Sequence, residues 1–446
     1  MLDEMFQILD RSSQNKDDAI KYRERRKKIL SLIEEEYPQK KGKVVLFSPI
    51  EYGSQSFLQD SSFYYFTGIS EPAHALIFDS VQGSVLYQPD FGELRSKWMS
   101  SVDVINQQTV TLFGIDDLRP LGIKMADYQL FPYFSMEDYQ EVILLLKDMI
   151  AQKQSIFTLY PTDKYQYALV KYIIDRLQLY VPDLFHHIVD ISPLVAQMRR
   201  KKDIAEVESM YQAIGITHTG FQAAARVLRD GVYESEVQAA IEYIFTENRS
   251  RPAYPSIVAG SKRATILHYH LNNQLLSNGQ TVLIDAGAMY QHYCADITRV
   301  FPVSGTFTDR QKELYEIVLE TQQHVVEHVR PGVWLNNAKE QDASLQHIAM
   351  KFLKNRGYDA YFIHGIGHYL GLDVHDVGSR LTPLQEGDVI TVEPGIYIPD
   401  ESIGIRIEDN YWVVANSQPV CLSEAIPKDI ADVEAMVQES FDIDVE

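Results

Sequence analysis

Four acidic residues in the second half of the sequence lie within, or at the end of, runs of aliphatic and β-branched residues: Asp285, Asp296, Glu393 and Glu408. Two unneutralised carboxylates ~4 Å apart repel each other by roughly 4 kcal/mol at an effective dielectric constant of ~20, so four together are unfavourable unless some of them protonate. Two divalent cations would cancel four negative charges. The pattern therefore indicates a site for two divalent metal ions.

An imidazole for such a site is available in the glycine-rich segment that begins at His364, continues through His368 and ends at His375-Asp376. Three glycines in seven positions disfavour a helix, so we expect a loop and a strand to present these histidines. Oxygen-rich ligands with one imidazole favour Mn²⁺, Mg²⁺, Co²⁺ or Zn²⁺ over copper or iron–sulfur chemistry. The sequence thus predicts which class of ion the site would take.

The spacing of the acids predicts how strands hold them. Asp296 lies 11 residues after Asp285, and Gly287 and the polar pair Gln291-His292 stand between them. This spacing suits an antiparallel hairpin with both carboxylates on one face. Arg406 and Glu408 are two residues apart and so share one face of their strand.

Each of these residues also has an ordinary structural interpretation. An isolated acid at a strand end is usually solvated or caps a turn, and a lone histidine in an apolar run is more often structural than catalytic. Independent surface residues would not each fall inside a hydrophobic strand, so the set as a whole favours a function. The pattern His324-x-x-Glu327-His328 matches an inverted zinc-peptidase motif, but the end of an amphipathic helix before Pro331-Gly332 explains it better.

The elements that must position these residues belong to two domains. In residues 1–195, strand-like runs such as 44–47 and 75–78 alternate with helical stretches such as 16–37 and 136–153, which predicts an α/β domain. The length of the chain supports the division into two domains, because 446 residues are more than a single hydrophobic core ordinarily holds.

Residues 196–446 predict an α+β domain in which helices pack on a curved antiparallel sheet. One long helical segment over 194–228 is expected to be broken by Gly215 and Gly220, and further helices are expected over 235–248, 309–329 and 337–355. The strands of this domain carry the four acids.

Composition excludes several classes of protein. A net charge of −21 repels phosphate backbones and anionic lipid, so neither nucleic acid nor a membrane surface is an expected partner. Cys294 and Cys421 are the only cysteines and form no CxxC pair, which excludes a thiolate zinc site. Residues 1–6 lack the features of a signal peptide and no stretch reaches the ~18 apolar residues of a membrane span, so we expect a cytoplasmic protein.

The sequence resembles the proline-specific metallopeptidases of the pita-bread fold, and among them the Xaa-Pro aminopeptidases. The segment 364–376 fits the family pattern His-Gly-x-Gly/Ser-His-x-x-Gly-x-x-Val-His-Asp without a gap. Six further segments resemble family segments in order: 254–259, 266–269, 285–287, 295–299, 392–397 and 405–409. A looser match over 59–68 extends the resemblance to the N-terminal half.

The resemblance implies a role for each candidate residue. It places Asp285, Asp296 and Glu408 on one metal ion, and Asp296, Glu408, His368 and Glu393 on the other, with Asp296 and Glu408 as bridges. Mn²⁺ is the expected metal, and Co²⁺ or Zn²⁺ are alternatives. Glu393 would also orient a bridging water and accept its proton.

Four further residues complete the expected site. His375 and His268 look like groups that contact the substrate or the tetrahedral intermediate, and His364 resembles a residue of the proline pocket. Arg406 is expected to pair with a carboxylate of the site or the substrate.

The resemblance implies hydrolysis of the N-terminal Xaa-Pro bond in peptides with proline in second position, by a hydroxide that bridges two metals, in a homo-oligomer (dimer or tetramer). One alternative is prolidase, which has the same ligands but cleaves Xaa-Pro dipeptides; the short interval between His375 and Glu393 favours the aminopeptidase. The other is a non-catalytic binding protein on this fold, which the intact acids and His368 disfavour.

Overall fold

The computed structural model describes residues 11–51, 56–122, 136–161, 169–379 and 382–443, and it divides the chain into two compact units, Met1–Arg199 and Arg200–Glu446. The division falls inside helix α8 (Ser192–Arg200), as does the expected boundary between residues 195 and 196. The expectation about residues 1–6 lies outside the described residues.

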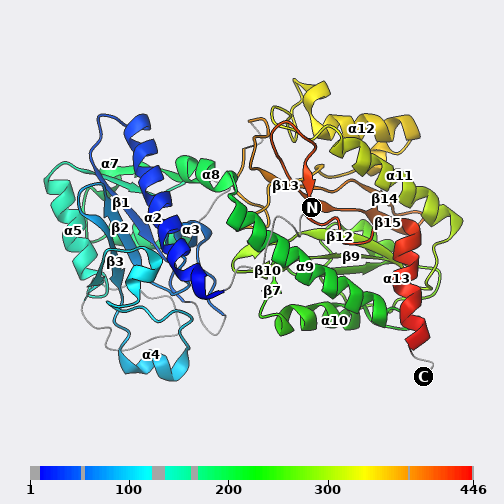
Figure 1. Cartoon of the computed structure of the whole chain (residues 1–446), viewed down its shortest axis with the longest axis horizontal. Coiled ribbons are helices and arrows are strands. Elements are labelled where there is room, and N and C mark those ends of the chain that lie inside the picture. The colour runs from blue at the N-terminus through cyan, green and yellow to red at the C-terminus, as the bar shows by residue number, and fades with distance from the viewer. Residues whose placement is uncertain (1–10, 52–55, 123–135, 162–168, 380–381, 444–446) are drawn as a thin grey trace. The chain divides into compact units, whose positions relative to one another are not determined.

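The N-terminal unit is built on one mixed sheet with the strand order β4-β3-β2-β1-β5-β6. Its strands are β1 (Gly42–Phe47), β2 (Ala75–Asp79), β3 (Gly83–Gln88), β4 (Asp117–Pro120), β5 (Ser155–Thr158) and β6 (Ile188–Asp190). Figure 1 labels the strands β1, β2 and β3 of this sheet. The pairs β1/β2 and β2/β3 are antiparallel, whereas β3/β4, β1/β5 and β5/β6 are parallel.

Helices cover both faces of this sheet, because alternate strand residues are apolar on each side. Val45 and Ile77 belong to a buried cluster that includes side chains of α5 and α6. On the opposite face, the rings of Phe66 in α3 and Phe78 in β2 lie 6.3 Å apart. The expected α/β domain is confirmed. The helices of the unit besides α8 are α2 (Arg11–Glu36), α3 (Ser61–Thr67), α4 (Gly92–Trp98), α5 (Gln140–Ala151), α6 (Leu169–Leu177) and α7 (Leu184–His187), with a short 3₁₀ helix η1 (Val110–Phe113).

The C-terminal unit begins with a helix whose start differs from the expectation. Instead of one segment over 194–228, α8 ends at Arg200 and α9 spans Ile204–Val227. Asp203 starts α9 as the N-cap of a capping box with Glu206, and this cap accounts for the break. Gly220 lies inside α9, where an added Cβ would come 3.2 Å from Ile241 of α10, so it permits close helix packing rather than ending the helix.

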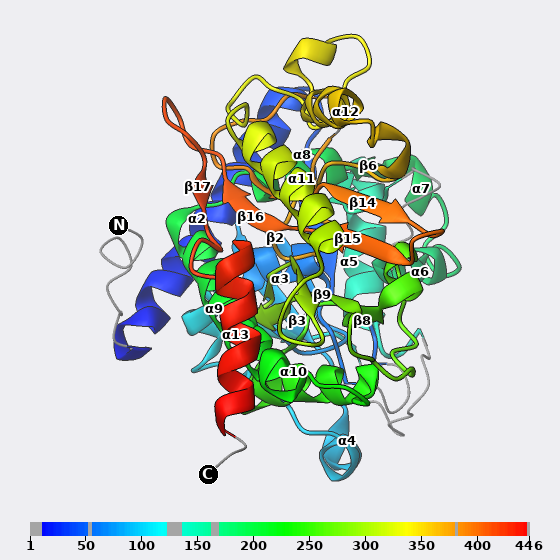
Figure 2. The ribbon, with the colours of Figure 1, turned by 90° about the vertical axis from the view of Figure 1, so that its right-hand side faces the viewer.

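The remaining helices of this unit are α10 (Glu234–Glu247), α11 (Asp309–Val326), α12 (Leu345–Arg356) and α13 (Ile430–Ile443), with 3₁₀ turns η2 (Ser261–Thr265), η3 (Gln341–Ala343) and η4 (Asp359–Tyr361). Figure 2 shows α11 crossing strands β14 and β15, with which it is in contact. The helix expected over 337–355 begins only at Leu345. In the part of the chain that the structure describes, no helix is long and apolar enough to cross a membrane.

The strands of the C-terminal unit form short antiparallel groups, β7-β10-β11, β8-β9-β12, β13-β16-β17 and β14-β15. Their bounds are β7 (Arg251–Pro252), β8 (Ile257–Gly260), β9 (Thr281–Ala286), β10 (Ala288–Tyr290), β11 (Tyr293–Cys294), β12 (Ile297–Pro302), β13 (Val389–Val392), β14 (Gly395–Ile398), β15 (Ile403–Arg406), β16 (Asp409–Trp412) and β17 (Val420–Cys421). A bridge between Thr298 and Glu408 links β12 to the segment between β15 and β16. Helices packed on antiparallel strands are thus confirmed for this unit, and the interruptions between its strands matter for the site.

Candidate metal centre

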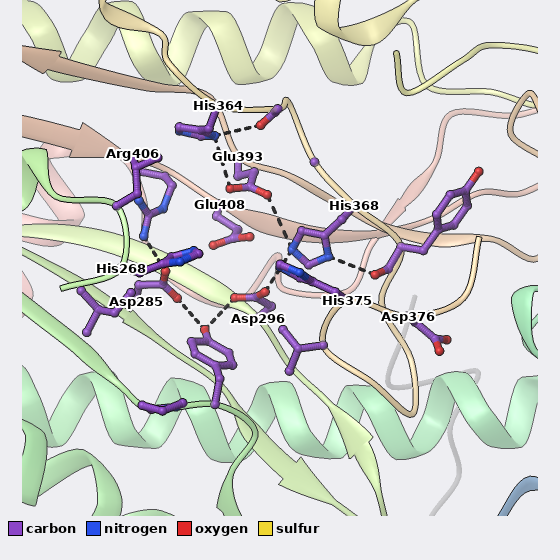
Figure 3. Close-up of a pocket in the computed structure, with 18 of the residues that line it drawn as sticks. His268, Asp285, Asp296, His364, His368, His375, Asp376, Glu393, Arg406 and Glu408 are labelled. Carbon is purple, nitrogen blue, oxygen red and sulfur yellow. Dashed lines mark hydrogen bonds and ion pairs between the residues drawn. The ribbon is translucent and has the colours of Figure 1, made fainter. Parts of the chain in front are cut away.

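Interruptions in the strands of the C-terminal unit place three of the four predicted acids. Asp296 lies between β11 and β12, Glu393 between β13 and β14, and Glu408 between β15 and β16. Asp285 lies in β9, one residue before its end. Where a strand ladder stops, consecutive side chains are released from strict alternation, so carboxylates from different strands can converge. Figure 3 shows the four carboxylates pointing toward one another.

The expected hairpin between Asp285 and Asp296 exists and depends on a glycine. Strands β9 and β12 pair with Ile297 opposite Ala286, so both acids lie at the same end of the ladder. Gly287 stands between them, where an added Cβ would collide with the backbone oxygen of Ala295. Only a residue without a side chain allows the backbone segments at Gly287 and Ala295 to approach so closely.

The glycine-rich segment forms a loop, as expected, and fixes the imidazole of His368. The backbone of His368 pairs with Thr391, with the amide of Thr391 donating to the carbonyl oxygen of His368 over 2.9 Å. The Nδ1 atom of His368 lies 3.0 Å from the carbonyl oxygen of Tyr369 and therefore carries the ring proton of the neutral form. Loss of the proton on Nε2, which a bound metal ion would displace, then leaves a free lone pair on this atom, which is the state that a metal ligand needs.

The Nε2 atom of His368 faces the predicted metal ligands. It lies 3.3 Å from Oδ2 of Asp296 and 3.6 Å from Oε1 of Glu393. Ligand atoms of Asp296, His368 and Glu408 all lie within 4.8 Å of one another. Three oxygen and nitrogen donors at this spacing fit a divalent ion after small side-chain movements.

Burial makes three carboxylates of the site costly to ionise. It raises the pKa of Glu393 to about 7, although the charges of His368 and Arg406 oppose the change. Burial and the neighbouring Asp296 raise the pKa of Glu408 well above its ordinary value. Burial also raises the pKa of Asp285, against the opposing charge of Arg406. The guanidinium of Arg406 alone does not neutralise this cluster. The repulsion between carboxylates that the sequence predicts is therefore present in the folded protein.

Arg406 connects several members of the cluster. Its guanidinium forms a buried ion pair with Asp285 and donates to the hydroxyl oxygens of Thr298, over 2.9 Å, and Tyr397, over 3.0 Å. Thr298 in turn donates to Glu408 over 2.7 Å. Arg406 thus orients one predicted ligand directly and another through Thr298.

Tyr397 continues this network to His364. The Nδ1 atom of His364 lies 2.8 Å from the carbonyl oxygen of Gly365 and so carries the proton. Nε2 then accepts the hydroxyl hydrogen of Tyr397 over 2.7 Å. Burial and the charge of Arg406 lower the pKa of His364 to about 3, so this imidazole stays neutral in the folded protein.

Tyr254 is a member of the site to which the sequence assigned no role. Its hydroxyl lies 2.5 Å from Asp285 and 2.6 Å from Asp296. A phenol has one hydrogen and can donate to only one carboxylate at a time. Each of the two carboxylates also has a second partner, Arg406 for Asp285 and His368 for Asp296. The only sequence signal was the position of Tyr254 in a segment that resembles the family.

The predicted residues line one cavity of about 530 Å³. These are Asp285, Asp296, His368, Glu393, Glu408, His268, His364, His375 and Arg406. The rings of His375 and His368 lie 4.2 Å apart, and His268 stacks with His270, which also lines the cavity. Leu267, Leu335 and Val374 add apolar surface. The cavity therefore combines a cation site with a wall that suits an uncharged side chain.

The His324-x-x-Glu327-His328 pattern lies away from this cavity. It occupies the end of α11, as the helical interpretation expected, although its ligand atoms also lie within 4.8 Å of one another. The side chain of Glu327 is 69% exposed and that of His324 is 38% exposed. None of the three residues lines the cavity.

Comparison with known proteins gives two matching families. Residues 208–415 match metallopeptidase family M24, and residues 22–126 match the aminopeptidase P N-terminal domain. An Xaa-Pro aminopeptidase of Haemophilus influenzae is 32% identical over 451 residues, which cover 93% of this chain and 96% of that protein. An Xaa-Pro dipeptidase of Pyrococcus horikoshii is 39% identical over 361 residues, covering 79% of this chain and 88% of that protein.

Solved structures give the same result. A putative aminopeptidase P from Bacillus anthracis superposes with a TM-score of 0.81 at 26% identity, over 95% of this chain and 99% of that chain. Aminopeptidase P from Escherichia coli with the inhibitor Pro-Leu gives a TM-score of 0.78 at 26% identity and the same coverage.

Proposed function

The chain belongs to the Xaa-Pro aminopeptidases of metallopeptidase family M24, and from this premise we infer that it hydrolyses the bond between an N-terminal residue and a proline in second position. The reaction is metal-dependent and releases the first residue of a peptide. The observation that carries the assignment is a group of four carboxylates, two of which face Nε2 of the His368 imidazole, within a cavity that has apolar walls.

We propose that the centre holds two divalent ions, with Mn²⁺ as the expected metal and Co²⁺ or Zn²⁺ as alternatives. Asp285, Asp296, His368, Glu393 and Glu408 would be the ligands, and Asp296 and Glu408 would bridge. The donor set supports this, since five such ligands match hard or borderline ions. Bound ions would supply Lewis acidity toward the scissile carbonyl and lower the pKa of water.

The residues of the chain have separate tasks in this proposal. Glu393 is suited to accept a proton at its carboxylate, because its pKa of about 7 in the metal-free protein lies near neutral pH. His364 stays neutral and is held by Tyr397, which suits contact with an apolar proline ring. His268 and His375 line the cavity beside the ligands and would contact the substrate or the developing oxyanion.

Metal dependence is the first test. Protein stripped of metal by a chelator should lose cleavage of Xaa-Pro-Yaa tripeptides, and Mn²⁺ should restore it. Peptides with alanine in second position serve as the control for proline specificity. Equal rates for stripped and restored protein would exclude a metal-dependent mechanism.

Substrate length separates the aminopeptidase from a dipeptidase. The dipeptidase is the second candidate because a dipeptidase relative reaches 39% identity. Chromatography of the products from Xaa-Pro dipeptides and from longer Xaa-Pro peptides, at matched concentration, compares the two directly. We expect faster cleavage of the longer peptides, and a strict preference for dipeptides would favour the second candidate.

We also propose a homo-oligomer, a dimer or tetramer, located in the cytoplasm. Trp98, Val102 and Val104 in the N-terminal unit are 62%, 77% and 72% exposed, and such apolar side chains are often covered in an assembly. Cys294 and Cys421 are both free thiols, which suits a reducing compartment. Sedimentation velocity measures the first property, and cell fractionation the second.

A further inference from the structure

The antiparallel pairing of two neighbouring segments of the metal centre is interrupted at the same place in both segments. The pairing of β13 with β16 ends at Val392 opposite Asp409, and the pairing of β14 with β15 starts at Gly395 opposite Arg406. Glu393 and Glu408 lie in the gap between these two ladders. Within the gap, the amide of Ile407 donates to the carbonyl oxygen of Pro394 over 3.3 Å. Because this long hydrogen bond replaces the regular strand pairing there, a further contact can help to set the distance between the two carboxylates.

The side chain of Gln322 in α11 provides such a contact. Its Nε2 atom donates to the carbonyl oxygen of Val392, directly before Glu393, and to that of Ile407, directly before Glu408, over 3.1 Å each. Both N–H groups of the amide are therefore used on the two interrupted strands. Gln322 is 0% exposed and does not line the cavity, so it acts from outside the site.

The orientation of this amide is chemically unambiguous. Backbone carbonyls only accept hydrogen bonds, so the nitrogen of the amide must face them. Its oxygen accepts from Nζ of Lys428 over 3.0 Å, and an ammonium only donates. Lys428 also forms an ion pair with Asp409 over 2.8 Å, which holds the ammonium in place. All hydrogen-bonding groups of the Gln322 amide are thus paired in one arrangement.

We propose that Gln322 is a positioning residue of the metal centre, which fixes the separation of Glu393 and Glu408 by joining the backbone segments that precede them. The proposal rests on the ligand set given under the proposed function. It predicts that loss of the amide weakens metal binding even where the fold survives, because a binuclear site needs its carboxylates at a defined distance.

A general contribution to stability is the competing explanation, and α11 offers a matched control for it. Gln311 is also buried in this helix, and its Nε2 donates to the carbonyl oxygen of Gly279 over 2.9 Å. Its oxygen accepts from the amide of Thr308 over 2.9 Å. Gly279 and Thr308 lie outside the cavity lining. Replacing either glutamine therefore removes a buried amide from α11, but only Gln322 touches the strands of the predicted ligands.

The test compares Gln322→Met with Gln311→Met, because methionine keeps the length of the side chain without its donors. Both variants also carry His328→Gln, which is the only change in the background protein. This substitution removes one possible ligand at the end of α11, so that Mn²⁺ bound there does not add to the titration. Free Mn²⁺ is measured by electron paramagnetic resonance during titration of the full-length protein. We expect the Kd for Mn²⁺ to rise by about 10-fold to 100-fold in Gln322→Met. In Gln311→Met it should stay within about twofold of the background protein, although both variants unfold at lower temperature.

Two further variants make each outcome decisive. Lys428→Met removes the group that orients the amide and should give an intermediate rise in Kd, which provides a second reading if Gln322→Met fails to fold. Asp296→Asn reports on the ligand set itself. If the background protein binds Mn²⁺ through Asp296 but Gln322→Met and Lys428→Met bind it equally well, the positioning role is wrong and the ligand set stands. If Mn²⁺ binding does not depend on Asp296, the ligand set and the positioning role both fail.

Discussion

At the scale of single residues, the structure assigns a chemical state to side chains that the sequence could only name. His368 and His364 both carry a proton on Nδ1, which donates to a backbone carbonyl oxygen, but their Nε2 atoms have different surroundings. In His368 this atom faces carboxylates, whereas in His364 it accepts from Tyr397. Two histidines four residues apart in one motif are therefore suited to different tasks.

The variant Asp296→Asn tests the proposed bridge. Asparagine keeps the shape of the side chain but removes one negative charge and one strong metal donor. Loss of an outer-shell partner alone typically costs 10-fold to 100-fold, so we expect kcat/KM to fall by more than about 100-fold. Steady-state kinetics at saturating Mn²⁺ measures this. Asp400→Asn, in the exposed turn between β14 and β15, removes the same charge and should leave the rate unchanged. Near-normal turnover of Asp296→Asn would exclude Asp296 as a ligand.

At the scale of elements, the metal centre depends on where strands stop. Three of the four carboxylates among the predicted ligands lie in gaps between strands, and the fourth lies one residue from the end of β9. The close approach at Gly287 holds the hairpin that carries Asp285 and Asp296. The buried side chain of Arg299 also holds the segment that carries Glu408. It donates to the carbonyl oxygen of Glu408 and to the carboxylate of Asp409, over 2.7 Å each.

The variant Gly287→Ala tests the hairpin. The new methyl group would meet the oxygen of Ala295, so the strands must separate and move both acids. A displacement near 1 Å in an active site can cost about 100-fold in rate, and we expect a loss of kcat/KM of that order. The measurements are kinetics and urea unfolding. In Gly215→Ala, the control, an added Cβ meets nothing within 4 Å inside α9, and helix propensity should raise stability by up to about 1 kcal/mol. Equal kinetics for both variants would contradict the role of Gly287.

At the scale of the whole molecule, metal and protons compete for one charged cluster. Burial raises the pKa of Glu393 from 4.5 to about 7. Burial alone would lower the pKa of His368, but the hydrogen bond with Asp296 and the charge of Glu393 outweigh this and raise it from 6.5 to about 9. In both cases the folded metal-free protein binds a proton more tightly than the unfolded chain does.

These shifts predict how stability depends on pH. The contribution of Glu393 falls as pH rises from 4.5 to 7, and that of His368 falls as pH rises from 6.5 to 9. Metal ions take the place of these protons, so the increase in unfolding temperature on adding Mn²⁺ should grow across the same range. Differential scanning fluorimetry with chelator or Mn²⁺, at constant ionic strength, measures this increase. An increase that is independent of pH would contradict the linkage.

The sequence by itself determined the α/β and α+β classes, the family and the residues that gather in the cavity, because alternation, glycine positions and charge in apolar runs are local properties of the chain. It misplaced the break between α8 and α9, where capping by Asp203 prevailed over the glycines. Only the tertiary structure decided the tautomers of the histidines, the bridge of Tyr254 between two acids and the double hydrogen bond of Gln322. Each of these depends on distances between segments far apart in the chain, which residue type and spacing do not encode.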